Sequence, residues 1–131
     1  MPTIPAGAPG ELRRCVTDDI AINFLGLEGA RVLATPAMIM LLEMTCRDSI
    51  LPFLDAGYDS VGTEVNVKHL AATPMGMEVT FKSEVIESDN RRVKFKVAAF
   101  DEKEQIADGT HERFVINVER FAARLKEKCG S

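Results

Sequence analysis

Residues 32–46 are apolar at almost every position and carry one acidic side chain, Glu43. Thr35 and Pro36 near its start are typical of a helix start, because threonine caps the first amides and proline lacks an amide that would stay unpaired. A proline and a glycine after Leu51 end the pattern, so the sequence predicts a helix from Thr35 to about Leu51. A helix that is apolar nearly all round must be covered on more than one side.

Extended segments separated by turn residues surround this helix. We expect a first strand in residues 11–22, a loop or short lid at 23–31, strands at 62–70, 77–88, 91–100 and 105–118, hairpin connections at 89–90 and 101–104, and an amphipathic terminal helix at 119–128. Gly109 inside the last strand indicates a bulge or a close backbone approach. The order predicts an α+β fold, with one helix on one face of an antiparallel sheet and a second copy of the chain completing its cover.

The size and composition indicate a single domain. With 131 residues and 46% hydrophobic content, we expect a flexible leader at residues 1–10 and one globular domain at 11–131. The net charge of -4 argues against a protein that coats nucleic acid. The apolar run at 36–42 is far shorter than the ~20 residues of a membrane span, so we expect neither nucleic acid nor membrane as a partner.

The three cysteines, Cys15, Cys46 and Cys129, form no CxxC pair and no Cys/His ligand spacing. The sequence therefore predicts neither a disulfide framework nor a metal site. Reduced thiols and a cytoplasmic location are the simplest interpretation. Cys46 is expected to be a small buried side chain rather than a nucleophile, because no histidine lies near it in sequence.

His69 stands at the end of the predicted strand 62–70. Alternation places it on the same face as Val61, Thr63, Val65 and Val67, which is the apolar face toward the helix. On the helix, Thr35 precedes Glu43 by eight residues, or roughly 12 Å along the axis. We therefore expect a substrate lying along the helix to reach Thr35, Glu43 and His69.

Each of these residues also has a simpler interpretation. Glu43 can pair with Arg47 one turn along the helix, an interaction worth only about 0.2–0.5 kcal/mol. Without a strong partner, burial would instead raise the pKa of Glu43 and suit it to general base catalysis. His69 alone is typical of a structural histidine, and Thr35 alone is typical of a helix cap that can also contact a ligand.

Several motifs together resemble one family. They are Thr35-Pro36-Ala37 with Glu43 eight residues after Thr35, Val61-Gly62-Thr63 ending at His69, Ala72-Thr73-Pro74-Met75-Gly76, and Gly109-Thr110-His111-Glu112-Arg113. Spread over roughly residues 32–121, they resemble the hot-dog-fold acyl-CoA thioesterases related to fluoroacetyl-CoA thioesterase. The resemblance implies a hot-dog fold, in which an antiparallel sheet wraps around one long central helix.

The resemblance also implies a hydrolytic site made of Thr35, Glu43 and His69. A thioester carbonyl is reactive, so the protein need only position water or a carboxylate, stabilise the oxyanion and protonate the thiolate. Glu43 would be the general base or transient nucleophile, His69 the acid–base partner, and Thr35 the orienting group. Backbone amides near Gly62 or at the helix start would bind the oxyanion. No cofactor or metal is expected beyond the coenzyme A of the substrate.

Coenzyme A brings phosphates, for which the chain offers basic residues on its strands. Lys68, Lys82, Arg91, Arg92, Lys94 and Lys96 alternate with apolar residues and are expected to face solvent. Arg91 and Arg92 at a hairpin are the predicted phosphate contacts. By resemblance Gly62 lies beside the acyl group and Arg113 falls on the arginine of the last-strand motif. For His111 and Arg113, a structural ion pair is an equal alternative to a substrate role.

Two departures from the fluoroacetate enzyme bear on the acyl group. The helix continues with residues 36–41 where that enzyme has aromatic and glycine residues, and the lid is shortened to 24–31. A short- or medium-chain acyl-CoA, or an aryl one, is therefore expected. The leading hypothesis is a thioester hydrolase acting as a homodimer or tetramer, with sites near the interface of two helices. The alternatives are a non-catalytic acyl-CoA-binding module and an enoyl-CoA hydratase or dehydratase.

Overall fold

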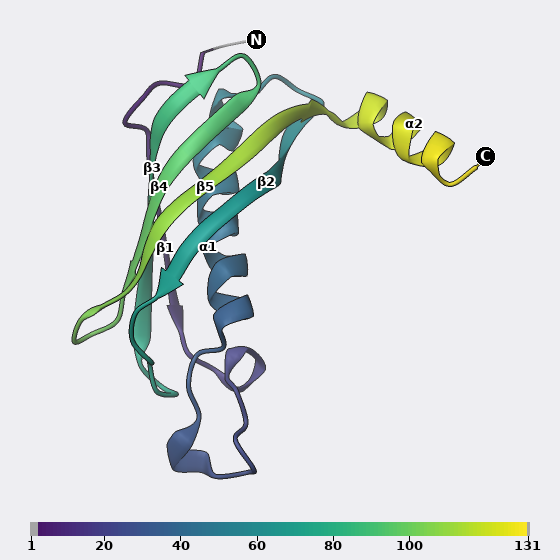
Figure 1. Cartoon of the computed structure of the whole chain (residues 1–131). Coiled ribbons are helices and arrows are strands. Elements are labelled where there is room, and N and C mark those ends of the chain that lie inside the picture. Colours follow the sequence, from purple (N-terminus) through teal and green to yellow (C-terminus); the bar gives the residue numbers. More distant parts are fainter. Residues whose placement is uncertain (1–2, 131) are drawn as a thin grey trace.

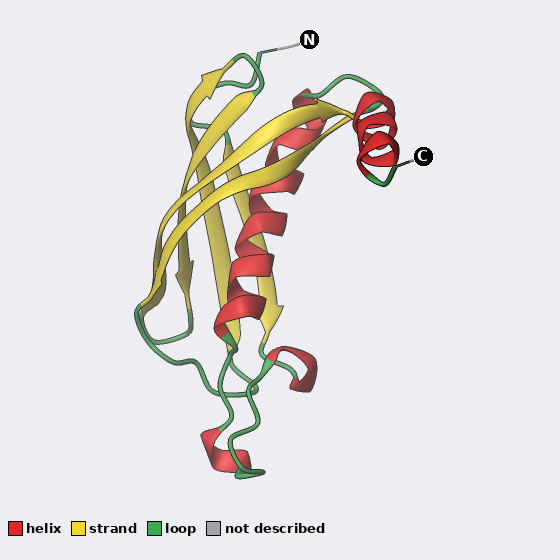
Figure 2. Ribbon diagram, turned by 45° about the vertical axis from the view of Figure 1, so that its right-hand side comes forward, coloured by secondary structure: helices red, strands yellow, loops and turns green. Residues whose placement is uncertain are grey.

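One long helix lies against a curved antiparallel sheet in the computed structural model, which describes residues 3–130 (Figures 1 and 2). The strands are β1 (Pro9–Cys15), β2 (Tyr58–His69), β3 (Glu78–Asp89), β4 (Arg92–Phe100) and β5 (Gln105–Asn117), and the helices are α1 (Thr35–Ile50) and α2 (Val118–Lys128). The strand order β1-β3-β4-β5-β2 leaves β1 and β2 as the two edges. The predicted α+β arrangement is confirmed.

The core lies between α1 and the sheet. Met38, Leu42, Cys46 and Ile50 recur every four residues along α1, are at most 2% exposed, and therefore share one face of the helix. Phe81, Phe95, Val97 and Val85 of the sheet belong to the same cluster. Burying each large apolar side chain contributes about 1.5–3 kcal/mol, so this face fixes α1 on the sheet. The opposite face keeps Met40 and Met44 nearly half exposed.

The N-terminal region differs from the prediction. Ile4 and Ala8 are buried in the core cluster, and the amide of Gly7 donates to the carbonyl of Val85. Residues 3–10 are therefore packed rather than a flexible leader, while residues 1–2 lie outside the described part. The expected strand at 11–22 is also shorter than predicted: β1 ends at Cys15, and residues 18–20 form a 3₁₀ turn in which Asp18 pairs with Arg31.

The helix prediction is confirmed except at its first residue. Ala34 is the N-cap, Thr35 is already helical, and no side chain within residues 3–130 caps the first amides. The predicted cap role of Thr35 is therefore wrong, because its hydroxyl is bound elsewhere, as described below. At the other end α1 stops at Ile50 and passes into a 3₁₀ turn at Leu51–Phe53, where the missing proline amide stops the helical hydrogen bonds.

A β-bulge in β2 changes which side chains face α1. The pairing of β2 with β5 shifts between Gly62 and Glu64, which leaves Thr63 as the extra residue, and such an insertion reverses the alternation of the strand. Gly62 and His69 are seven residues apart, yet both face α1. The prediction that Val61 and Thr63 share a face with His69 is therefore wrong, whereas the predicted direction of His69 is confirmed.

The remaining elements lie close to their predicted bounds, except that β2 begins at Tyr58, four residues before the predicted start. A Cβ added at Gly109 would collide with the backbone of Asn66 in β2, so the predicted close approach is confirmed and the bulge lies in β2 instead. The β3–β4 hairpin turns at Asn90-Arg91, one residue later than predicted, with Asn90 in the left-handed region at φ 55°. The terminal helix α2 projects from the end of the sheet (Figure 1), and none of its residues is buried. No helix within residues 3–130 is long and apolar enough to cross a membrane.

Candidate active site

Thr35 and His69 form a direct pair between the first turn of α1 and the last residue of β2. Thr35 Oγ1 lies 2.7 Å from His69 Nδ1, within hydrogen-bond distance. The second ring nitrogen, His69 Nε2, is buried and has no hydrogen-bond partner among the described residues. A buried nitrogen without a partner is costly unless a ligand uses it, so Nε2 is available to a bound molecule.

This pair lines an apolar pocket of about 370 Å³, a volume in the range of small-molecule sites. Its other walls come from the loops before α1 and after β2, namely Ile22, Val32, Leu33, Leu70, Ala71 and Ala72. A larger hollow of about 640 Å³ is lined by residues of the N-terminal segment, β1, β3 and β4. It is lined by none of Thr35, Glu43 and His69.

Glu43 belongs to a second polar cluster. Its Oε1 lies 3.5 Å from Arg113 Nη1 and 3.6 Å from His111 Nε2, and its side chain is 37% exposed. Gly62 leaves the space for this contact, since an added Cβ would overlap Oε1 and press on the ring of His111. The carboxylate is thus held beside a cation and still reaches solvent.

The alternative pairing of Glu43 with Arg47 is wrong. Arg47 donates from Nε and Nη2 to the two carboxylate oxygens of Asp59, at 2.9 and 2.6 Å. This fork geometry suits arginine and carboxylate, and the hydrogen bond from Arg47 holds the pKa of Asp59 below its usual value. Arg47 therefore binds Asp59 of β2 rather than Glu43, and Glu43 contacts the second cluster.

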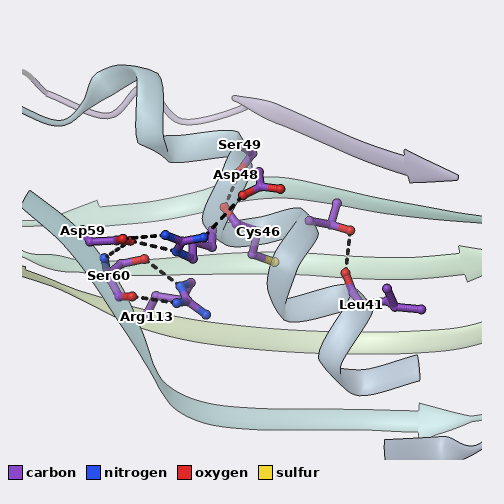
Figure 3. Close-up of polar contacts among 9 residues, drawn as sticks. Leu41, Cys46, Asp48, Ser49, Asp59, Ser60 and Arg113 are labelled. Atoms are coloured by element: carbon purple, nitrogen blue, oxygen red, sulfur yellow. Dashed lines mark hydrogen bonds and ion pairs between the residues drawn. The ribbon is translucent and has the colours of Figure 1, made fainter. Parts of the chain in front are cut away.

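Arg113 is buried at the centre of this cluster. It donates from Nε to Ser60 Oγ at 2.7 Å, from Nη2 to the Ser60 carbonyl at 2.8 Å, and from Nη1 to His111 Nε2 at 3.2 Å; Figure 3 shows Arg113 reaching Ser60. His111 in turn contacts the carbonyl of Glu64 through Nδ1 at 2.8 Å. Burial lowers the pKa of both Arg113 and His111.

Within one chain the predicted set does not converge. Thr35 and His69 meet, whereas the ion-pair partners of Glu43 are His111 and Arg113. Thr35 precedes Glu43 by eight positions, which separates the two groups by roughly 12 Å along α1. One signal for the second group was present in the sequence, because His111 and Arg113 share strand parity, but nothing there connected them with Glu43.

Arg91 and Arg92, the predicted phosphate contacts, each have a different partner in the structure. Arg92 donates to Glu112 at 2.7 Å, whereas Arg91 stacks over the ring of Tyr58, 5.7 Å from its centroid. Both lie near the Tyr58 end of the sheet, at the opposite end of β2 from His69. The pair therefore does not line the Thr35–His69 pocket of the same chain.

The cysteine prediction agrees with the structure. Cys46 is fully buried on α1, and burial raises the pKa of its thiol to about 12. A thiol held in the protonated form is a poor nucleophile. Within residues 3–130, no group of three or more His, Cys, Asp or Glu side chains is placed to hold a metal ion.

Residues 16–119 match the family model of the fluoroacetyl-CoA-specific thioesterases. The chain belongs to this family. The fluoroacetyl-CoA thioesterase of Streptantibioticus cattleyicolor is 41% identical over 101 residues, which cover 77% of this chain and 73% of that one. The match to the family model includes every candidate residue of both polar clusters, since all of them lie between residues 16 and 119.

Solved structures place this thioesterase in the hot-dog fold. A mutant of the fluoroacetyl-CoA enzyme in complex with acetyl-CoA superposes with a TM-score of 0.87 at 33% identity, over 95% of this chain and 98% of that one. A hot-dog-like protein from Thermanaerovibrio acidaminovorans has a TM-score of 0.87 at 25% identity, over 97% and 94%. The predictions of a hot-dog fold and of a thioester hydrolase are confirmed.

Proposed function

We propose that this thioesterase hydrolyses acyl-CoA thioesters, with the acyl group in the pocket beside Thr35 and His69. The observation that carries the proposal is the 2.7 Å contact between Thr35 Oγ1 and His69 Nδ1 in an apolar pocket. A hydroxyl at Nδ1 fixes the plane of the imidazole and leaves Nε2 to exchange protons with the substrate. The acetyl-CoA bound by the related enzyme's mutant supports the same substrate class here.

In the proposed reaction the C–S bond of the thioester breaks and a C–O bond forms. Glu43 either takes a proton from the attacking water or attacks the carbonyl itself to form an acyl-enzyme anhydride that water then hydrolyses. In both cases His69 delivers a proton to the departing thiolate. The first-turn amides of α1 are candidates for binding the oxyanion, because no side chain caps them and a helix N-terminus favours negative charge. Amides near Gly62 are the alternative.

We further propose a homodimer whose sites are each built from two chains. The edge strand β2 has one unpaired side and exposes Val65, and α1 exposes Met40 and Met44, which are apolar groups that a second copy would cover. A two-fold axis crossing β2 near Val65, midway between Gly62 and His69, would bring each Glu43 level with the partner's Thr35–His69 pair. Glu43 of one chain and the Thr35–His69 pair of the other would then belong to the same site.

For coenzyme A we propose Arg91 as the phosphate contact, with a lesser role for Arg92, whose charge is already matched by Glu112. Arg91→Gln should raise the KM for an acyl-CoA but leave the KM for the matching pantetheine thioester, which has no nucleotide phosphates, unchanged. An equal effect on both substrates would contradict the assignment.

The acyl group we propose is short, medium-length or aryl, and the location is the cytoplasm. We also propose that the reaction needs no metal or other cofactor. Activity should then survive dialysis against a chelator. Loss of activity that is restored by one divalent metal would contradict this.

The decisive experiment measures thiol release from short-chain, medium-chain and aryl acyl-CoA by wild type, Glu43→Gln and His69→Gln. We expect turnover by the wild type and a loss of about 10²-fold or more in kcat/KM for each variant, the usual contribution of an acid–base residue. Circular dichroism would establish that each variant is folded. Saturable binding without thiol release, or hydration of an enoyl-CoA in its place, would overturn the proposal.

A further inference from the structure

His111 is a buried titratable side chain that the proposed reaction does not use. It is 2% exposed and its ring stacks on Phe95 of β4, with centroids 6.1 Å apart. The groups facing it are Glu43 from α1, Arg113 from β5 and the main-chain carbonyl of Glu64 from β2. Each ring nitrogen therefore meets a defined partner.

The partners decide the protonation of the ring. The carbonyl of Glu64 can only accept, so Nδ1 of His111 must carry the proton. In the neutral ring Nε2 is then a lone pair, and it accepts from Arg113 Nη1 at 3.2 Å. A protonated ring would instead set an N–H against this guanidinium N–H, and Glu43 Oε1, 3.6 Å from Nε2, lies too far away to accept it.

The hydrogen bond from Arg113 Nη1 to His111 Nε2 sets the direction of that Nη1 group. Ser60 binds Nε and Nη2, and the third nitrogen, Nη1, lies between His111 Nε2 and Glu43 Oε1. Arg113 is the cation that Glu43 contacts. Moving Nη1 would therefore move the charge that holds the carboxylate over Gly62.

We propose that His111 is a positioning residue that acts through Arg113 to hold Glu43 in its reacting orientation. The proposal rests on the proposed function, since Glu43 has to be the reacting carboxylate. His111 needs no contact with the substrate. Its contribution is to supply an acceptor at Nε2 and a donor at Nδ1, in a ring oriented by the carbonyl of Glu64.

The kinetic test compares His111→Phe, which keeps an aromatic ring but no acceptor, with His111→Gln, whose amide oxygen can reach the position of Nε2. We expect His111→Phe to lower kcat by at least about tenfold with little change in KM, and His111→Gln to recover most of the loss. Phe95→Leu is the control, since it loosens the packing under the ring without removing a polar group. Wild-type kcat in a folded His111→Phe, or an equal kcat loss in Phe95→Leu, would overturn the proposal.

A double-mutant cycle separates this proposal from the proposed function. If the wild type releases no thiol from any acyl-CoA, the proposed function fails. If the wild type is active and Glu43→Gln impairs it, adding His111→Phe to Glu43→Gln should cause little further loss, because both changes act on one carboxylate. A further loss as large as that in the wild-type background would overturn the role of His111.

Nitrogen NMR of the histidine rings provides a test that does not depend on activity. The chain has two histidines, so His111→Gln assigns both sets of signals. We expect the Nδ1–H tautomer for His111 at neutral pH, and a change in its Nε2 signal in Arg113→Lys. The Nε2–H tautomer in the wild type would overturn the proposal even if His111→Phe fails to fold.

Discussion

Gly62 lies directly against Glu43, so that any side chain at this position would overlap the carboxylate oxygen Oε1. We expect Gly62→Ala to displace the carboxylate from Arg113 and to lower kcat by at least about tenfold, because small misplacements of reacting groups are costly. Gly29→Ala is the matched control, since no atom of the described part of the chain lies within 4 Å of its Cβ position. Equal kinetics for both variants and the wild type would contradict the placement of Glu43 in the reaction.

Thr35→Ala removes the hydroxyl that binds His69 Nδ1. We expect kcat/KM to fall by roughly ten- to a hundredfold, because the imidazole loses the group that fixes its orientation. The melting temperature should change little, since Thr35 does not cap α1. Thr35→Ser keeps the hydroxyl and should stay near wild type, and a serine variant as impaired as the alanine one would argue against this role.

Two inactive variants should restore activity when they are mixed. If each site combines Glu43 of one chain with His69 of its partner, a heterodimer of Glu43→Gln and His69→Gln contains one intact site and one doubly altered site. Random exchange after partial unfolding should then yield about a quarter of wild-type activity. A mixture that stays inactive, although mass spectrometry detects the heterodimer, would place the whole site within one chain.

The lowered pKa of His111 has a consequence for stability against pH. Burial favours the neutral ring in the folded protein, so the unfolded chain, with a histidine pKa near 6.5, binds more protons once the pH falls below that value. The contribution of the neutral His111 ring to the free energy of unfolding should therefore be complete above about pH 6.5. It should be lost as the pH falls toward the lower pKa of the folded state. Urea denaturation at about pH 7.5 and about pH 5.5 measures this, and His111→Gln should show a smaller decline. An equal decline in both proteins would contradict it.

The buried N-terminal segment should contribute to stability. Ile4 is 6% exposed and belongs to the core, so Ile4→Ala should lower the free energy of unfolding by about 2 kcal/mol, through lost burial and the cavity left behind. Thr3→Ala at the exposed neighbouring position is the control. Thermal unfolding checks the difference, and the same melting temperature for both variants would restore the interpretation of a loose leader.

Local sequence patterns were sufficient for the elements and for half of the site. The apolar run with Pro36 at its start predicts α1 to within one residue at each end, because helix propensity and proline chemistry act over neighbouring residues. The direction of His69 also followed from alternation near the end of its strand. The spacing of Thr35, Glu43 and His69 with the glycine motifs indicated the family, since these residues keep fixed separations along the chain.

Contacts between distant segments could be read only from the tertiary structure. The bulge at Thr63 arises from the register between β2 and β5, and a register depends on long-range hydrogen bonding that no local period records. The same pairing sets Gly62 beside Arg113 and His111, and so selects the partners of Glu43. The sequence by itself determined which side chains can do the chemistry. The packing of strand against strand and helix against sheet decided which of them meet, because burial and hydrogen-bond geometry act between residues far apart in the chain.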